Sequence, residues 1–384
     1  MKTLAQHLDP ATTSGPKRIL ACDGGGIRGA LTLGYLKKIE TILREKENNP
    51  DLLLCDYFDL IGGTSTGSII ASGLAIGMSV DEIITLYMDL GGKIFGKKYD
   101  WWKPWETFKF LRANFDYSAL RDSLLKTFSN DDGEPILMGG PEIKTGLCVV
   151  AKRADTNSTW YLINHPDGKF YDSEEGVNKD IPLWQAVRAS SAAPTYFVPQ
   201  MIEVGNGETA AFVDGGVSTS NNPSLALLMV ATLKGFPFHW EMGADKLEVV
   251  SVGTGYSIFS KKIGDIEKNW MLSWAKSVPE MLMQDSSWQN QIIMQWLSDS
   301  KTAVEIDMEI EDLNGDQLGG KPLIKYLRYN TPLTVDSLEK LMGKDYSDEQ
   351  VASIIEMSNA ENRFELLDIG LAAAEDEISA GHFS

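Results

Sequence analysis

The sequence predicts an α/β protein of three layers, in which helices cover both faces of a mainly parallel central sheet. Short apolar segments recur along the chain and have the length and composition of buried strands. The first two of these segments are each followed by glycines and then by a stretch whose apolar residues have helical spacing. A strand, a tight turn and a helix, repeated twice, are typical of the start of a parallel α/β sheet.

The first strand is expected at 19–22, and the apolar residues between Leu31 and Leu43 predict a helix after it. The second strand, at 58–61, is followed by glycines and by a helix-like stretch at 68–76. The remaining elements are predicted by the same two patterns. Strands are expected at 146–151, 160–164, 211–213, 247–252 and 323–328, and helices at 183–192, 225–233, 266–297 and 361–379.

Composition and charge limit the classes of function. Among 384 residues, Lys and Arg number 35 while Asp and Glu number 54, so the formal charge is −19. This charge opposes general attraction to nucleic acid or to anionic lipid. Residues 1–17 are polar and contain Pro10, Gly15 and Pro16, which predicts a flexible leader. The rest is expected to form one large domain at 18–375, with lid or insert segments near 93–112 and 260–300.

The three cysteines have no spacing that is typical of a zinc site or a disulfide framework, so Cys22, Cys55 and Cys148 are expected in the core. The first ten residues lack the apolar run of a signal peptide. The uncharged run at 60–80 is rich in Gly, Ser and Thr, which makes it a poor transmembrane helix. We therefore expect a cytoplasmic protein, with peripheral membrane association as an alternative.

The first candidate site is a glycine-rich loop between the first strand and its helix. It follows Asp23 and consists of Gly24, Gly25, Gly26, Ile27, Arg28 and Gly29. Glycines let the backbone approach an anion at the N-terminus of a helix. The spacing also fits a dinucleotide fingerprint, but that fold needs an acid at the end of the second strand. The corresponding position falls at 44–47, inside or just after the helix, which disfavours an oxidoreductase.

The second candidate site follows the second strand, where a serine lies among small residues in the pattern G-x-S-x-G. The motif is formed by Gly63, Thr64, Ser65, Thr66 and Gly67. Small neighbours permit the strained strand-to-helix turn that exposes a nucleophilic hydroxyl, called a nucleophile elbow. The alternative is a small-residue turn without catalysis.

The third candidate site is an aspartate at the end of a strand, Asp214, followed by Gly215 and Gly216. Such an acid is either a base or an ordinary turn residue. A serine nucleophile usually takes its base from histidine. The four histidines, His7, His165, His239 and His382, have no persuasive position for a triad. A direct Ser–Asp pair is therefore worth considering.

The three motifs, in this order, resemble the patatin-like phospholipase family, which has a glycine-rich oxyanion loop, a G-x-S-x-G serine and an aspartate in D-G-[AG]. Further segments resemble other parts of the same family, and these are 188–197, 251–255, 326–330 and 359–370. The resemblance covers about residues 18–375. It implies a patatin-like α/β/α domain over that range.

The resemblance also implies the chemistry. Ser65 is expected to be the nucleophile and Asp214 its base, with an acyl-enzyme intermediate that water hydrolyses. The backbone N–H groups of Gly25 and Gly26, with Ile27 as a third candidate, are expected to bind the oxyanion. Arg28 is expected to contact a substrate phosphate or to hold the loop by an ion pair, and the second role is favoured. No metal and no cofactor are implied.

Two segments are candidates for lipid access. The segment 93–112 contains Trp101, Trp102 and Trp105, and its six basic and two acidic residues give a local charge of +4. This composition is typical of transient contact with a membrane surface, but also of aromatic residues packed into the core below exposed lysines. The region 270–296 is rich in Met and Trp, which favours ordinary core helices over a flexible cover for acyl chains.

The leading prediction is a serine acyl hydrolase, of the phospholipase A or lysophospholipase type, whose partner is a phospholipid or lysophospholipid and not nucleic acid. A generic carboxylesterase or acylglycerol lipase is an alternative within the enzymes. A non-catalytic patatin-like storage or binding protein is another alternative, against which the intact Ser65 and Asp214 count.

Overall fold

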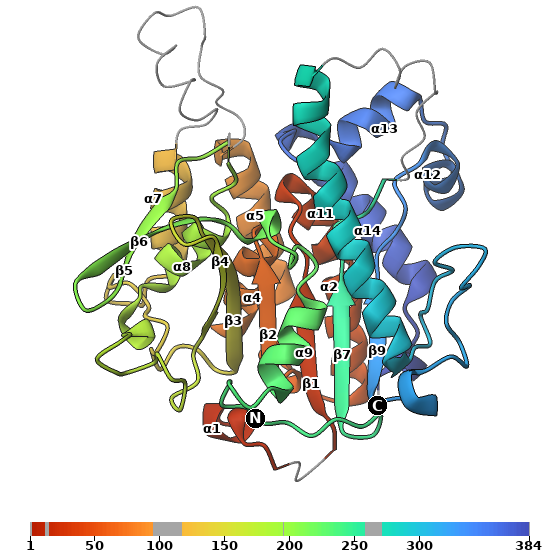
Figure 1. The fold of residues 1–384 in the computed structure, drawn as a ribbon. Coiled ribbons are helices and arrows are strands. Elements are labelled where there is room, and N and C mark those ends of the chain that lie inside the picture. Colours follow the sequence, from red (N-terminus) through yellow and green to blue (C-terminus); the bar gives the residue numbers. More distant parts are fainter. Residues whose placement is uncertain (1, 12–14, 95–116, 195, 258–270, 384) are drawn as a thin grey trace, which may run out of the picture.

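The computed structural model describes residues 2–11, 15–94, 117–194, 196–257 and 271–383. Within these ranges one sheet contains nine strands. The strands are β1 (Lys17–Cys22), β2 (Leu60–Thr64), β3 (Gly146–Arg153), β4 (Ser158–Ile163), β5 (Gln200–Gly205), β6 (Glu208–Asp214), β7 (Leu247–Val252), β8 (Ser298–Asp299) and β9 (Ile324–Tyr329). Their order across the sheet is β5-β6-β3-β2-β1-β7-β9-β8, and β4 pairs with β3 (Figure 1).

The central part of the sheet is parallel. Strand β1 pairs in parallel with β2 and β7, and the parallel pairing continues from β2 to β3 and from β7 through β9 to β8. The antiparallel pairs lie at the other side, where β3 pairs with β4 and β6, and β5 with β6. Because the carboxyl ends of parallel strands meet at one edge, the loops after β1, β2 and β7 come together there.

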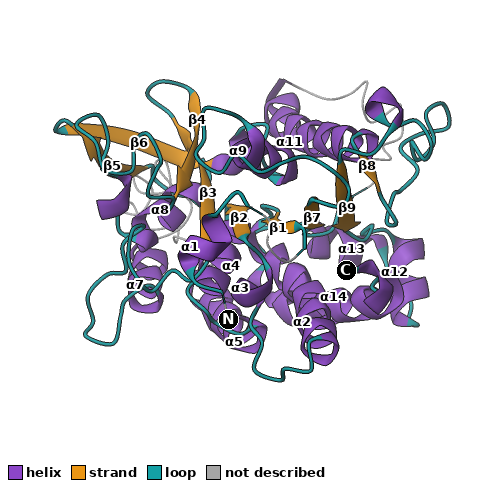
Figure 2. Cartoon of the chain, turned by 90° about the horizontal axis from the view of Figure 1, so that it is seen from below, coloured by secondary structure: helices purple, strands orange, loops and turns teal. Residues whose placement is uncertain are grey.

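Helices cover both faces of this sheet, which confirms the predicted three layers. Figure 2 shows α2, α4, α5 and α14 below the sheet, and α9 and α11 above it. The helices of the described residues are α1 (Leu4–Leu8), α2 (Gly29–Lys46), α3 (Leu54–Tyr57), α4 (Thr66–Ala75), α5 (Val80–Ile94), α7 (Tyr117–Thr127), α8 (Leu183–Ser190), α9 (Ser224–Thr232), α11 (Met271–Trp296), α12 (Val335–Met342), α13 (Asp348–Ile355) and α14 (Arg363–Glu377).

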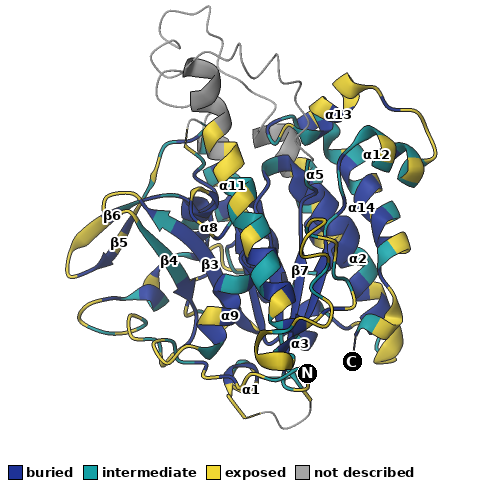
Figure 3. Ribbon diagram, turned by 45° about the vertical axis from the view of Figure 1, so that its right-hand side comes forward, coloured by how far each residue is buried: buried dark blue, intermediate teal, exposed yellow. Residues whose placement is uncertain are grey.

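Two apolar clusters fill the space between the layers. The larger joins the sheet to α2, α4 and α14, and the smaller joins the opposite face to α9 and to Met294 of α11. Helices α2 and α14 touch through their backbones, since a Cβ added to Gly34 would lie 2.4 Å from the carbonyl carbon of Gly370. Figure 3 shows α2 and the sheet as buried, whereas the part of α11 that is coloured there carries exposed, intermediate and buried residues.

The prediction of a flexible leader over 1–17 is wrong for residues 2–11. These residues contain α1, whose first turn is closed by a capping box between Thr3 and Gln6. His7 and Leu8 are buried, and the Nδ1 atom of His7 lies 2.9 Å from the Oδ1 atom of Asp59. The polar composition of the segment concealed a short amphipathic turn that is held by this buried pair.

The expected lid or insert segments are covered only in part. Residues 95–112, with all three tryptophans of the first segment, lie outside the described residues, as do 260–270 of the second. The helix expected at 266–297 is described as α11. Met294 is fully buried, but Met281 and Leu282 are 41% and 60% exposed, so among the described side chains of α11 those near its C-terminal end belong to the core.

Within the described part of the chain, no helix combines the length and apolar character needed to cross a membrane. Cys22, Cys55 and Cys148 are free and buried, as the sequence predicted.

Candidate active site

Ser65 lies at the turn between β2 and α4, where its backbone adopts φ 54° and ψ −124°. A positive φ is unfavourable for a residue with a side chain and is found at strained functional turns. The flanking glycines permit this turn. A Cβ on Gly63 would lie 2.1 Å from the carbonyl oxygen of Gly67, and a Cβ on Gly67 would lie 2.1 Å from that of Cys22. The segment 63–67 therefore has the geometry of a nucleophile elbow.

The strained turn is fixed by a serine that the sequence analysis did not single out. The N–H of Ser65 donates to the Oγ of Ser190 at 2.9 Å, and the Ser190 hydroxyl donates to the carbonyl of Val150 at 2.5 Å. Ser190 thus connects the elbow to β3. The sequence indicated Ser190 only as part of the segment 188–197, which resembles the family. Nothing in the local pattern distinguishes this serine from its neighbours.

Ser65 and Asp214 are in direct contact. The hydroxyl of Ser65 donates to the Oδ2 atom of Asp214 at 2.6 Å, although the two residues are 149 positions apart in the chain. The other carboxylate oxygen, Oδ1, accepts the N–H of Gly216 at 2.7 Å. Asp214 ends β6 and is only 5% exposed. The arrangement presents one carboxylate oxygen to the nucleophile and fixes the other.

Burial changes the chemistry of this carboxylate. Removal from water raises the pKa of Asp214 to about 6, against the opposing effects of the hydrogen bonds from Ser65 and Gly216 and of the charge on Arg188. A carboxylate with a higher pKa is a stronger base and is still ionised at neutral pH. Asp214 therefore fits the role of a general base better than an exposed aspartate would.

The glycine loop lies directly beside the serine. A Cβ on Gly24 would lie 3.3 Å from the Cβ of Ser65, and a Cβ on Gly25 would lie 2.2 Å from the Oγ1 of Thr254. Gly26 has φ +58°, and a Cβ there would lie 2.4 Å from the carbonyl oxygen of Met357. Close approach and backbone conformation thus require glycine throughout 24–26.

The amides of this loop differ in their availability. Among the hydrogen bonds of the described residues, none is donated by the N–H of Gly25 or Gly26, whereas the N–H of Ile27 donates to the carbonyl of Met357 at 2.9 Å. Gly25 and Gly26 can therefore bind an oxyanion as they stand. The N–H of Ile27 would first have to break its hydrogen bond to Met357, so Ile27 is not available as a donor.

The other predicted residues support these groups. Thr64 donates its hydroxyl to the carbonyl of Ser220 at 2.5 Å, and the hydroxyls of Thr66 and Tyr87 lie 2.8 Å apart. A Cβ on Gly29 would lie 2.5 Å from the Oγ1 of Thr66, and one on Gly215 would lie 2.4 Å from a backbone oxygen of β3. These contacts hold the three motifs against one another.

Arg28 is buried beside acidic groups. Its side chain lies at the end of the 3₁₀ turn Gly26–Arg28 and is 7% exposed. Burial lowers the pKa of Arg28 to about 10, against the opposing charges of Glu280 on α11 and of Asp23. An acidic environment of this kind agrees with the favoured role of Arg28 in holding the loop.

In the described structure, no histidine makes a hydrogen bond to Ser65 or Asp214. The ring of His165 packs edge-on against Phe238, and His382 bonds to the hydroxyl of Tyr329. The described part of the chain also holds no cluster of three or more His, Cys, Asp or Glu side chains that could bind a metal ion. The chemistry that this arrangement offers is a serine hydroxyl, a carboxylate base and two backbone amides.

Known proteins are similar to this chain in sequence. The model of the family described as patatin-like phospholipase matches residues 20–228. Patatin-17 of Solanum cardiophyllum is 30% identical over 262 residues, which cover 62% of this chain and 60% of that protein. The cGAMP-activated phospholipase of Escherichia coli (strain TW11681) is 31% identical over 246 residues, which cover 62% of each protein. The chain thus spans about three fifths of the length of these two relatives.

Two solved structures are also similar, at low sequence identity. Human GIVD cytosolic phospholipase A2 has a TM-score of 0.43 and 10% identity, covering 98% of this chain and 61% of that one. VipD from Legionella pneumophila has a TM-score of 0.35 and 14% identity, covering 92% of this chain and 67% of that one. The family model, by contrast, matches more than half of the sequence and includes both the serine and the aspartate motifs. The chain belongs to the patatin-like phospholipase family.

Proposed function

We propose that this chain is a lipid acyl hydrolase that cleaves fatty acyl esters of phospholipids or lysophospholipids through a Ser65–Asp214 dyad. The observation that carries the proposal is the 2.6 Å hydrogen bond from the Ser65 hydroxyl to a buried carboxylate of Asp214. A serine in a strained elbow, next to a base and to unoccupied backbone amides, is the arrangement that acyl transfer requires.

In the first half of the reaction, Ser65 Oγ attacks the ester carbonyl carbon while its proton passes to Asp214 Oδ2. The carbonyl oxygen becomes an oxyanion and accepts hydrogen bonds from the N–H groups of Gly25 and Gly26. Loss of one such donor typically costs about 10²–10³ in rate. The tetrahedral intermediate then releases the alcohol, which takes the proton from Asp214, and the acyl group stays on Ser65.

In the second half, water attacks the acyl-enzyme and Asp214 accepts a proton from it. The same amides bind the second oxyanion. The intermediate collapses, the fatty acid leaves, and the proton on Asp214 returns to Ser65 Oγ. Every proton is thus carried by one carboxylate, which must be ionised at the start of each half-reaction.

The test is release of fatty acid from phospholipid vesicles without added calcium, by wild type and by the variants Ser65→Ala and Asp214→Ala. Ser72→Ala is a matched control, since Ser72 is a buried serine of the same helix whose hydroxyl makes no hydrogen bond among the described residues. We expect activity in wild type and Ser72→Ala only. Release that persists in folded Ser65→Ala would rule out the nucleophile.

A second substrate and a ligand separate the alternatives. Hydrolysis of short p-nitrophenyl esters without release from vesicles would favour a generic carboxylesterase. Because one relative is named a cGAMP-activated phospholipase, the assay is repeated with cGAMP. Activity only in its presence would support a ligand-gated phospholipase, whereas no activity under any condition would support a storage or binding protein.

A further inference from the structure

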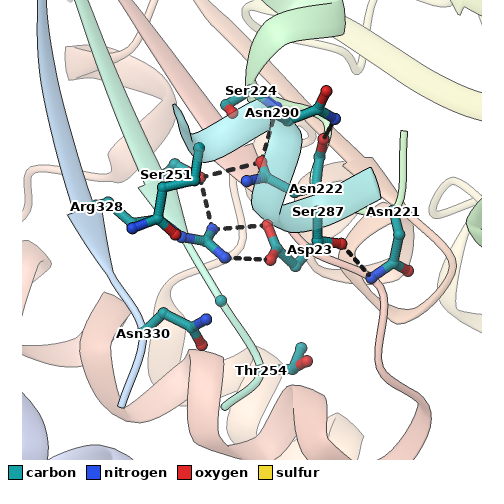
Figure 4. A network of polar contacts seen from close by, with 12 residues as sticks. Asp23, Asn221, Asn222, Ser224, Ser251, Thr254, Ser287, Asn290, Arg328 and Asn330 are labelled. Atoms are coloured by element: carbon teal, nitrogen blue, oxygen red, sulfur yellow. Dashed lines mark hydrogen bonds and ion pairs between the residues drawn. The ribbon is translucent and has the colours of Figure 1, made fainter. Parts of the chain in front are cut away.

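A buried ion pair lies one residue before the glycine loop. The guanidinium of Arg328 donates to both oxygens of Asp23, from Nη1 to Oδ1 at 2.9 Å and from Nη2 to Oδ2 at 2.6 Å (Figure 4). Arg328 and Asp23 are 5% and 4% exposed. The two parallel hydrogen bonds fix the orientation of the carboxylate as well as its position.

Arg328 reaches this carboxylate from two strands away. It lies on β9, opposite Ser251 of β7, and Ser251 in turn lies opposite Ala21 of β1. The side chain therefore crosses β7 to reach the end of β1. On the way, Nη1 also donates to the hydroxyl of Ser251 at 2.7 Å. Three neighbouring strands are thus tied together at the edge where the candidate site lies.

Stability alone is a poor explanation for such a pair. Burying two charges has a desolvation cost that their attraction only about balances, and apolar side chains of similar size often stabilise a core as well or better. What apolar side chains cannot provide is a fixed direction, because their contacts are not directional. The bidentate geometry therefore indicates that the position of Asp23 matters in itself.

The position of Asp23 determines the position of the loop that follows. The N–H of Asp23 donates to Val252 O at 3.1 Å, and the N–H of Gly24 donates to Asn221 O at 3.0 Å. The carbonyl of Gly24 accepts the hydroxyl of Thr254 at 3.1 Å. The N–H groups of Gly25 and Gly26 donate no hydrogen bond among the described residues, while the carbonyl of Gly26 accepts the hydroxyl of Tyr87.

We propose that Arg328 is a positioning residue for the oxyanion-binding amides: through Asp23 it sets the direction in which Gly25 and Gly26 present their N–H groups to Ser65. The inference rests on the proposed hydrolase function. It predicts that loss of Arg328 impairs the chemical step more than the binding of substrate, because the oxyanion exists only after the attack.

A second ion pair on the same strands provides a control. Lys325 of β9 lies opposite Glu248 of β7, and its Nζ atom lies 3.1 Å from the Oε2 atom of Glu248, whose side chain is fully buried, whereas that of Lys325 is 18% exposed. Lys325 lies three residues before Arg328 on β9, further from the loop end of that strand. Loss of Lys325 removes a cation from the same two strands and leaves the contact to Asp23 in place.

The experiment compares Arg328→Met, Arg328→Lys, Asp23→Asn and Lys325→Met with wild type on a soluble p-nitrophenyl ester. We expect Arg328→Met and Asp23→Asn to lower kcat about 100-fold, the effect of losing one oxyanion donor. KM should change less than threefold, and the pH at which the rate is half maximal should not move. Arg328→Lys keeps the positive charge but cannot make two parallel hydrogen bonds to Asp23, so its kcat should lie between those of Arg328→Met and wild type. The kcat of Lys325→Met should stay within threefold of wild type.

Hydrogen–deuterium exchange of peptides that contain residues 24–27 provides a readout that does not depend on activity. We expect faster exchange there in Arg328→Met and Arg328→Lys, and wild-type exchange in Lys325→Met. If Ser65→Ala stays active, the proposed function fails, and the exchange result alone decides on Arg328. Exchange at 24–27 that is unchanged in folded Arg328→Lys and Asp23→Asn, or a kcat within threefold of wild type in both, would overturn the inference.

Discussion

In the proposed mechanism, Asp214 serves as a base without the help of histidine. Its carboxylate is buried, and only two hydrogen bonds, from the Ser65 hydroxyl and the Gly216 amide, reach its oxygens among the described residues. The same burial that makes the carboxylate a stronger base also makes its charge costly to the fold. Two predictions test these two effects of burial, one on the strength of the base and one on the stability of the fold.

The first prediction concerns pH. Because the pKa of Asp214 is raised to about 6, the base is protonated and inactive below that pH and ionised above it. We expect kcat/KM on a soluble p-nitrophenyl ester to rise about tenfold per pH unit below 6 and to level off above it. A half-maximal rate near pH 4 would show that the carboxylate is solvated and would contradict the proposed base.

The second prediction concerns stability. An aspartate in the unfolded chain has a pKa of about 3.9, so a folded pKa of about 6 means that the native state binds the proton more tightly. Stability is therefore complete below about pH 4 and falls as the pH rises towards 6, by about 3 kcal/mol in all. Asp214→Asn, which cannot ionise, should resist urea better than wild type at pH 8 although it is inactive.

Urea unfolding at pH 4 and pH 8 measures this difference. The two proteins should unfold at similar urea concentrations at pH 4, where the carboxyl of wild type is protonated. A variant that is less stable than wild type at pH 8 would show that the ionised carboxylate stabilises the native state, which is the opposite sign.

At the scale of single elements, helix α1 is held to the body of the protein by a buried charge. Asp59 is fully buried and accepts hydrogen bonds from Lys2 at 2.7 Å, from the ring of His7 at 2.9 Å and from the N–H of Arg18 at 3.0 Å. The helix itself has a single turn of α-helix, which is too short to be stable alone. Its attachment therefore depends on this carboxylate and on the buried Leu8.

The third prediction follows from that attachment. His7→Ala leaves Asp59 with one partner fewer in a dry environment, and we expect it to lower the free energy of unfolding by about 3 kcal/mol. Asp59→Asn added to His7→Ala should restore part of the loss, because the buried charge that has lost its histidine partner is then gone. Urea unfolding of the two variants measures both effects. Equal stability of His7→Ala and wild type would contradict the role of the pair.

The elements that the sequence predicted are those whose pattern lies within a few neighbouring residues. The short apolar runs predicted β1, β3, β7 and β9, and the glycine and serine motifs predicted the loops after β1 and β2. Strand β5 was not predicted, because the exposed Met201 beside the buried Ile202 interrupts the alternation of polar and apolar residues that marks a half-buried strand. Helices α5, α7, α12 and α13 were also missed.

The same distinction holds within the site. Ser65, Asp214 and the glycines belong to short motifs that can be recognised in isolation. Ser190 and Arg328 act on Ser65 and Asp23 over 125 and 305 positions of the chain. Such contacts exist only after the strands have been placed side by side, so no local pattern marks them. The leader was misjudged for the same reason, since its partner Asp59 is 52 positions away from His7.

For the whole molecule, net charge governs the approach to a lipid surface. A charge of −19 opposes binding to anionic membranes, and the opposition weakens as salt shortens the screening length from about 30 Å at 0.01 M to about 3 Å at 1 M. The basic segment 93–112 acts in the opposite direction. The two charges make opposite predictions for binding to anionic vesicles.

The fourth prediction is that the overall charge prevails. At low salt we expect weaker binding to vesicles rich in phosphatidylglycerol than to vesicles of phosphatidylcholine, and added salt should narrow the difference. Sedimentation with vesicles measures binding, and the hydrolysis of a neutral soluble ester, which should not depend on salt, is the control. Stronger binding to the anionic vesicles at low salt would assign membrane contact to 93–112 instead.

The distance along the chain between the dyad and the groups that hold the glycine loop has a consequence for synthesis on the ribosome. Ser65 and Asp214 leave the ribosome well before Arg328, which binds Asp23, and Met357, whose carbonyl accepts the N–H of Ile27. A nascent chain can thus contain nucleophile and base while its oxyanion loop is still without these two anchors. Translation order alone would then leave the loop without these contacts until the segments that contain Arg328 and Met357 have been synthesised.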